Sequence, residues 1–184
     1  MALKSAQMAG LQVNQQTLAG AHKWLKSVAK GQKGGLFAYR PDSGPSPTMT
    51  SVGVLATQYL GAQRNDPRVV EGMNFFMATM PNPKARNCYY WYYATQVMHN
   101  LPGPEWDRWN REMRRILIES QVKEGCATGS WDPKVPTADP HGEAGGRVMV
   151  TAIATLTLEV YYRYLPLYQL EPTEAAGTKT ASAN

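Results

Sequence analysis

Apolar residues recur at helical spacing along most of the chain, in runs separated by glycine and proline. Between residues 15 and 30, apolar side chains fall three and four positions apart, which is typical of an amphipathic helix. Gly31 follows this run and predicts its end. Similar runs predict further helices over residues 52–60, 66–77, 87–101, 105–121 and 147–165. The pattern therefore predicts an all-α protein.

Local signals sharpen three of these predictions. Thr48 or Thr50 can cap the second helix, and Asp66 followed by Pro67 is an N-cap with proline in the first turn. Residues 148–160 are rich in β-branched side chains, but the run exceeds the roughly ten residues that strands rarely pass. We therefore expect a helix there as well.

A short motif recurs in three of the predicted helices. The copies are Ala56-Thr-Gln-Tyr-Leu60, Ala94-Thr-Gln-Val-Met98 and Ala154-Thr-Leu-Thr-Leu158. Each follows a helix with charges on one side, so the repeated unit is interpreted as a helical hairpin with an apolar inner and an amphipathic outer helix. Residues 1–13 are interpreted as an inner helix without its outer partner. We expect the repeat domain to span residues 1–170 and residues 171–184 to form a disordered tail.

The segments 121–133 and 145–164 carry a family resemblance. With Gln121, Gly125 and Trp131, they resemble the Gln-Trp repeat of squalene-hopene cyclases and of the protein prenyltransferase β subunit, in the form found in bacterial prenyltransferase and squalene oxidase repeat proteins. The resemblance implies an α/α toroid, of which this chain corresponds to the C-terminal part. We expect the Gln121 amide to reach backbone groups at the next helix end. The Trp131 indole is expected to cover a helix end and to donate its N–H there.

The resemblance also implies a central pocket that is lined by inner helices and binds isoprenoid chains. Cyclases of this type protonate an alkene with an Asp-x-Asp-Asp motif, which this sequence lacks, so we expect no catalysis by the chain alone. Tyr90, Trp91, Tyr93 and Tyr161 either line an apolar pocket or pack in the core. The sequence leaves both interpretations open.

Prenyltransferases hold zinc with Asp, Cys and His, so the resemblance makes Cys126, Asp139 and His141 candidate ligands. These residues lie in a loop rich in glycine and proline, without the paired spacing of zinc sites. We therefore predict no metal and no other cofactor.

Charge is unevenly distributed along the 184 residues, which carry a net charge of +5. Residues 1–65 contain seven lysines and arginines and a single acid, Asp42. This excess indicates either solvated helix faces or an anionic partner, and both remain open. We expect no nucleic-acid partner, because the lysines are dispersed and lack interleaved aromatic residues. Two cysteines and the lack of a long uncharged apolar run predict a cytoplasmic protein without a transmembrane segment.

These observations favour a non-catalytic α/α-toroid module that acts in binding or assembly through its apolar inner helices. The alternative is part of a terpene cyclase or prenyltransferase that acts on isoprenoids, with its catalytic acid outside this chain. An open arc of hairpins would expose apolar flanks at residues 1–13 and 148–165. We therefore expect self-association, or a larger polypeptide or complex that completes the ring, with an isoprenoid as a possible ligand.

Overall fold

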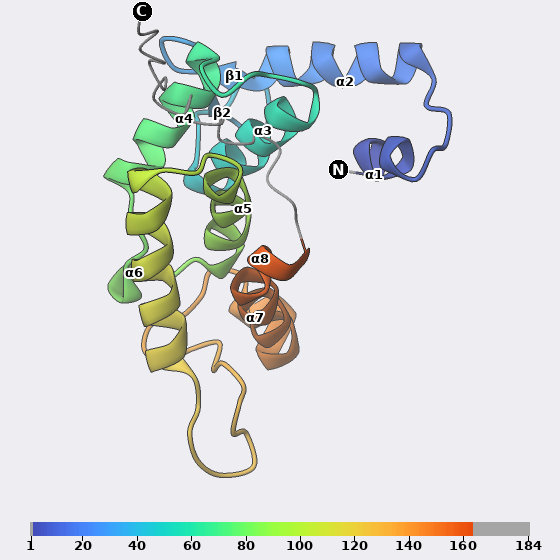
Figure 1. The fold of residues 1–184 in the computed structure, drawn as a ribbon. Coiled ribbons are helices and arrows are strands. Elements are labelled where there is room, and N and C mark those ends of the chain that lie inside the picture. Colours follow the sequence, from blue (N-terminus) through green and yellow to red (C-terminus); the bar gives the residue numbers. More distant parts are fainter. Residues whose placement is uncertain (1, 164–184) are drawn as a thin grey trace, which may run out of the picture.

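Helices make up most of residues 2–163, the part of the chain that the computed structural model describes, and the all-α prediction is confirmed (Figure 1). The α-helices are α1 (Ala2–Met8), α2 (Gln15–Val28), α3 (Pro47–Tyr59), α4 (Pro67–Ala78), α5 (Cys88–His99), α6 (Pro104–Ser120), α7 (Gly142–Leu158) and α8 (Val160–Arg163), with a 3-10 turn η1 at Pro83–Ala85. Two short strands, β1 (Ala29–Lys30) and β2 (Leu36–Phe37), pair antiparallel within this part of the chain. The sequence pattern did not predict them.

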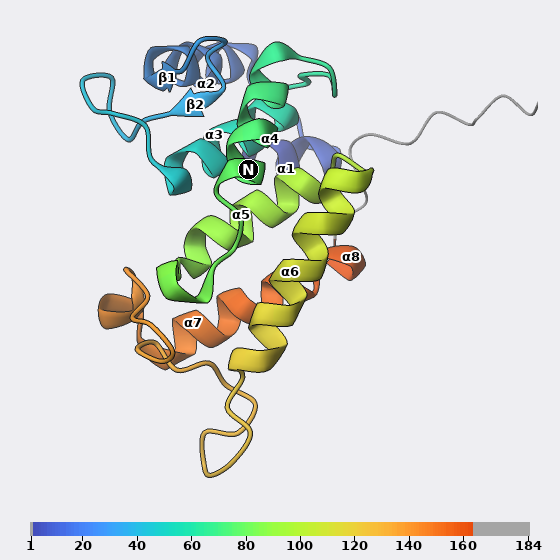
Figure 2. The ribbon, with the colours of Figure 1, turned by 90° about the vertical axis from the view of Figure 1, so that its left-hand side faces the viewer.

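The helices α3, α5 and α7 lie side by side, with α5 in the middle and in contact with both neighbours. Helices α4 and α6 pack against this group from one side, which is the left-hand side of Figure 1 and the near side of Figure 2. The more apolar helices thus form one layer, and two of the more polar helices cover it.

Helix α5 is the most enclosed element. Nine of its residues are buried: Cys88, Tyr90, Trp91, Ala94, Thr95, Gln96, Val97, Met98 and His99. A helix that is apolar on most sides must be covered on most sides, and α3, α4, α6 and α7 provide that cover. The core of the protein therefore centres on α5.

Helix α6 buries one stripe of side chains at helical spacing: Trp106, Trp109, Met113, Ile116 and Leu117. The sequence analysis predicted this amphipathic helix, and the structure confirms it. The Trp109 ring is fully buried, and its Nε1 donates to Thr95 Oγ1 of α5 at 2.9 Å. Burying the indole therefore leaves no unmatched donor.

The predicted N-cap of α4 is confirmed, because the Asp66 carboxylate accepts the Arg68 N–H and Pro67 opens the helix. The predicted cap of α3 is wrong. Ser46 is the N-cap and accepts the Met49 N–H, while Thr48 lies inside the helix. Pro47 explains the shift, since proline suits the first helical position and the residue before it favours extended backbone.

The N-terminal helices depart from the expected arrangement. Helix α1 has no buried residue, so it is not an inner helix, and α2 buries only Val28. In Figure 1, α2 runs across the top of the view while α4 and α6 run down its left side. Helix α2 is therefore not a third member of the outer layer.

The last predicted helix is divided. The backbone of α7 breaks at Gly146, whose φ of 63° is left-handed, and α8 follows after Glu159. None of the helices in residues 2–163 is both long enough and apolar enough to span a bilayer. The predicted boundary at residue 170 and the predicted tail at 171–184 lie outside the described residues.

Candidate functional site

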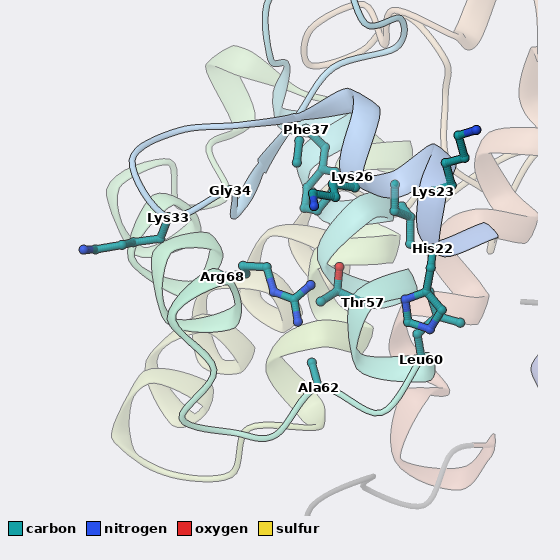
Figure 3. A pocket seen from close by; sticks show the side chains of 12 residues that line it. His22, Lys23, Lys26, Lys33, Gly34, Phe37, Thr57, Leu60, Ala62 and Arg68 are labelled. Atoms are coloured by element: carbon teal, nitrogen blue, oxygen red, sulfur yellow. The ribbon is translucent and has the colours of Figure 1, made fainter. Parts of the chain in front are cut away.

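A cavity of about 650 Å³ lies beneath α2, between that helix, α3 and the start of α4 (Figure 3). Its size is in the range of small-molecule pockets. The apolar part of its lining comes from Leu25, Ala29, Phe37, Leu60 and Ala62, and the polar part from His22, Lys23, Lys26, Lys33, Thr57 and Arg68. The cavity thus has an apolar interior and a cationic edge, and its lining residues lie up to 46 positions apart in the sequence.

The loop beside this cavity is held by one carboxylate. Glu71 of α4 accepts the backbone N–H groups of Gln32 (2.7 Å), Lys33 (3.0 Å) and Gly35 (2.7 Å). Burial opposes ionisation of Glu71, but these hydrogen bonds outweigh it and lower the pKa of the carboxyl below its usual value. Glu71 therefore fixes the loop after β1 to α4.

Glycine is needed where this loop meets α4. A Cβ on Gly35 would lie 2.1 Å from the Arg68 main-chain oxygen, which no side chain tolerates. Gly34 has a φ of 77°, in the left-handed region. The Gly34-Gly35 pair thus permits the close approach that shapes one wall of the cavity.

The cations at the cavity differ in direction. Lys26 and Arg68 point into it, whereas Lys23 and Lys33 extend away from it (Figure 3). Arg68 is ion-paired with Asp66 through Nη2 (2.6 Å) and Nε (3.0 Å), and this pairing lowers the pKa of Asp66. No aspartate or glutamate among the described residues lines the cavity itself.

The aromatic residues singled out in the sequence do not form one pocket. Tyr90 and Trp91 are buried in the core and also line one side of a more open cleft at the N-terminal end of α5. Tyr93 packs against Tyr89 and Tyr92, with ring centroids 5.1 and 5.0 Å away, and does not line that cleft. The side chain of Tyr161 lies outside the described residues.

Tyr90 has a structural contact as well. Its hydroxyl donates to the Thr79 main-chain oxygen at 3.1 Å and lies 2.8 Å from Thr79 Oγ1. Burial raises the pKa of this phenol, so Tyr90 stays protonated over the physiological range. The residue therefore ties α5 to the end of α4.

The three candidate zinc ligands do not come together. Asp139 is buried, and its carboxylate accepts the backbone N–H groups of Cys88 (2.7 Å) and His141 (2.9 Å). Cys126 is exposed in the loop, and His141 packs beside the ring of Tyr89. Among residues 2–163, no group of three or more His, Cys, Asp or Glu side chains is placed to hold a metal ion.

Asp139 instead belongs to a buried polar cluster that the sequence analysis missed. The neighbouring Arg86 is 5% exposed and donates Nη1 to the main-chain oxygens of Asp132 (2.5 Å) and Val135 (2.8 Å). Burial raises the pKa of the Cys88 thiol in this cluster to about 11, which removes it as a nucleophile. These contacts anchor the loop before α7 to the start of α5.

The Gln-Trp segment has a structural role that only partly matches the prediction. The Trp131 indole is buried, and its Nε1 donates to the Leu117 main-chain oxygen near the end of α6, as expected. The Gln121 amide donates to Gly129 in its own loop at 3.0 Å, so the expectation that it reaches the next helix end is wrong. The turn between them explains this, because Gly125 adopts a φ of 76° and folds the loop back on itself.

Comparisons of the chain with models of protein families, with curated proteins and with solved structures found no match. The resemblance to the squalene-hopene cyclase and prenyltransferase repeat thus stays a prediction from the motif.

Proposed function

We propose that the chain is a helical-hairpin module of the α/α-toroid type found in terpene cyclases and prenyltransferases, and that it acts in assembly rather than in catalysis. The observation that carries this proposal is the exposed outer side of the last helix in the apolar layer. Val148 of α7 is 84% exposed and Tyr162 of α8 is 90% exposed, although α7 packs on α5 with its other side.

Three features support the hairpin interpretation. The more polar helices α4 and α6 alternate in sequence with the apolar helices α3, α5 and α7, and both lie on the same side of the apolar layer. The repeated alanines fall at buried positions in the two later copies, since Ala94 is 0% and Ala154 is 1% exposed. Small residues there let neighbouring inner helices approach closely. Trp131 joins α6 to α7 within the last pair.

The opposite end of the fold also exposes large apolar side chains. Met8, Leu11 and Trp24 are 76%, 64% and 56% exposed. Both apolar ends belong to the same chain, so a second copy supplies a partner surface for each of them. We therefore propose that a second copy of the chain binds the exposed side of α7.

Thiol labelling tests this assignment. Val148→Cys is prepared in a Cys126→Ser background, which removes the exposed native thiol and leaves the buried Cys88. Val135→Cys in the same background is the matched control, because Val135 is an exposed valine of the loop before α7. We expect maleimide to label position 148 more slowly as protein concentration rises, and position 135 at a constant rate. Equal rates at every concentration would contradict the proposal.

A further inference from the structure

The cavity beneath α2 has the chemistry of a ligand site. We propose that it binds an amphiphile with one anionic head group, a carboxylate or a phosphate, on a short apolar body. This inference does not depend on the assembly role, because the cavity lies under α2 and not on the exposed side of α7.

The apolar body of the ligand would occupy the inner part of the cavity. Phe37 and Ala62 are buried there, and Leu25, Ala29 and Leu60 complete the apolar lining. The cavity is partly open to solvent, and its volume of about 650 Å³ is in the range of small-molecule pockets. Transfer of an alkyl chain from water to this surface would supply most of the affinity.

The position of α2 explains why this volume is open. Its apolar side, which includes Leu18 and Leu25, is only half-buried, and Val28 at its C-terminal end is its single buried residue. The loop at one side of the cavity is held in place, since Glu71 fixes Gly31–Gly35 to α4 through three hydrogen bonds. A ligand in the cavity would therefore cover the half-buried apolar side of α2.

The head group would meet two cations. Lys26 comes from α2 and Arg68 from α4, and both are directed into the cavity (Figure 3). Asp66 holds Nε and Nη2 of Arg68, which orients the guanidinium and leaves Nη1 for an anion. Asp66 offsets the charge of Arg68, whereas Lys26 is a cation with no acidic side chain beside it in the lining, so the site favours an anionic ligand over a neutral one.

Titration calorimetry with three ten-carbon probes tests the proposal: decanoate, decyl phosphate and neutral decanol, each below its aggregation concentration. We expect decanoate, decyl phosphate or both to bind, and decanol to bind at least roughly tenfold more weakly, since hydrogen bonds to charged groups are stronger than those between neutral groups. Absence of binding by both anions, or equal affinity for decanol, would overturn the proposal.

A pair of lysine variants locates the site. Lys26→Gln removes the ammonium group that points into the cavity, and Lys84→Gln removes an equal charge from an exposed lysine of η1 that does not line the cavity. We expect Lys26→Gln to weaken anion binding roughly tenfold and Lys84→Gln to leave it within about twofold, because a charge outside the cavity acts only through screened long-range attraction. Equal losses in the two variants would show nonspecific attraction to a basic surface and overturn the proposal.

A third variant tests the apolar part. Ala62→Leu adds side-chain volume to the cavity lining, and circular dichroism confirms that the variant is folded. We expect it to reduce the affinity for decyl phosphate while leaving that for inorganic phosphate unchanged. Unchanged decyl phosphate binding by the folded variant would contradict the assigned cavity.

Vesicles that contain phosphatidylglycerol then distinguish the two sources of such a ligand. Cosedimentation of the protein with the vesicles that decyl phosphate competes away indicates a membrane lipid. The absence of cosedimentation indicates a free amphiphile.

Discussion

The indole Nε1 of Trp131 donates a hydrogen bond to the main-chain oxygen of Leu117, 2.8 Å away. Leu117 lies in the last turn of α6, where carbonyl groups lack backbone N–H partners within the helix. The backbone N–H of Trp131 donates to Thr151 Oγ1 of α7 at 3.1 Å. One residue thus connects the end of α6 to the following helix across a long loop.

Trp131→Ala should lower the free energy of unfolding by about 3–5 kcal/mol, because it removes a buried indole and leaves a cavity. Trp131→Phe keeps an aromatic ring and should cost less, with the loss of the hydrogen bond to Leu117 contributing about 1 kcal/mol. Urea unfolding measures both values. An alanine variant that loses less than about 1 kcal/mol would show that the indole does not brace α6 and α7.

Glu71→Gln should lower the stability by about 1 kcal/mol near neutral pH, because the backbone N–H groups of Gln32, Lys33 and Gly35 lose a charged acceptor. The pKa of Glu71 in the folded protein is below its usual value of 4.5. Its contribution is therefore complete above pH 4.5 and is lost as the pH falls through the folded-state pKa. The variant should lack this part of the acid dependence, and parallel pH curves for the two proteins would refute the role assigned to Glu71.

His99 should make the protein less stable in mild acid. Its ring is buried beside Trp106, with centroids 5.2 Å apart, and burial lowers its pKa below 6.5. The unfolded chain therefore takes up a proton more readily, so stability falls as the pH drops below 6.5 toward the folded-state pKa. Thermal melts between pH 7 and pH 5 should show a smaller decline for His99→Gln, and an equal decline would contradict this assignment.

Incubation with squalene or with farnesyl diphosphate should give no cyclised or transferred product, because the sequence lacks the Asp-x-Asp-Asp acid of the cyclases. Mass spectrometry of extracted lipids is the measurement. Product formation by the isolated chain would overturn the non-catalytic assignment. It would direct attention to Asp132, which is paired with Arg147, and to Asp139 and Glu143.

Local sequence patterns predicted the helices well. The Asp66-Pro67 pair marks the start of α4, and the buried stripe of α6 is the one that its apolar spacing indicates. Such features depend on residues within a few positions of one another, where backbone preferences and helical periodicity decide the outcome. The start of α3 shows the limit of these signals, because Ser46 and Thr48 are both good caps and Pro47 selects between them.

The candidate site could not be predicted in the same way. Glu71 and Gly35 are 36 residues apart, and nothing near either residue indicates that a carboxylate of one helix fixes a distant loop. Asp139 was a candidate metal ligand only through the family resemblance, and we predicted no metal, but no local pattern indicated that in the fold its oxygens accept backbone N–H groups. The excess of lysine in the first third of the chain was visible in the sequence, and three of these lysines line the cavity beneath α2.

The mass of the protein in solution tests the assembly role most directly. Static light scattering behind a sizing column, with the chain loaded at tens of micromolar, compares that mass with the 20.4 kDa of a single copy. We expect at least twice this mass, and we expect Val148→Glu to lower it toward one copy while Val135→Glu leaves it unchanged, because Val148 lies on the exposed side of α7 and Val135 on a loop. A wild-type chain that stays at 20.4 kDa at every concentration would contradict the account.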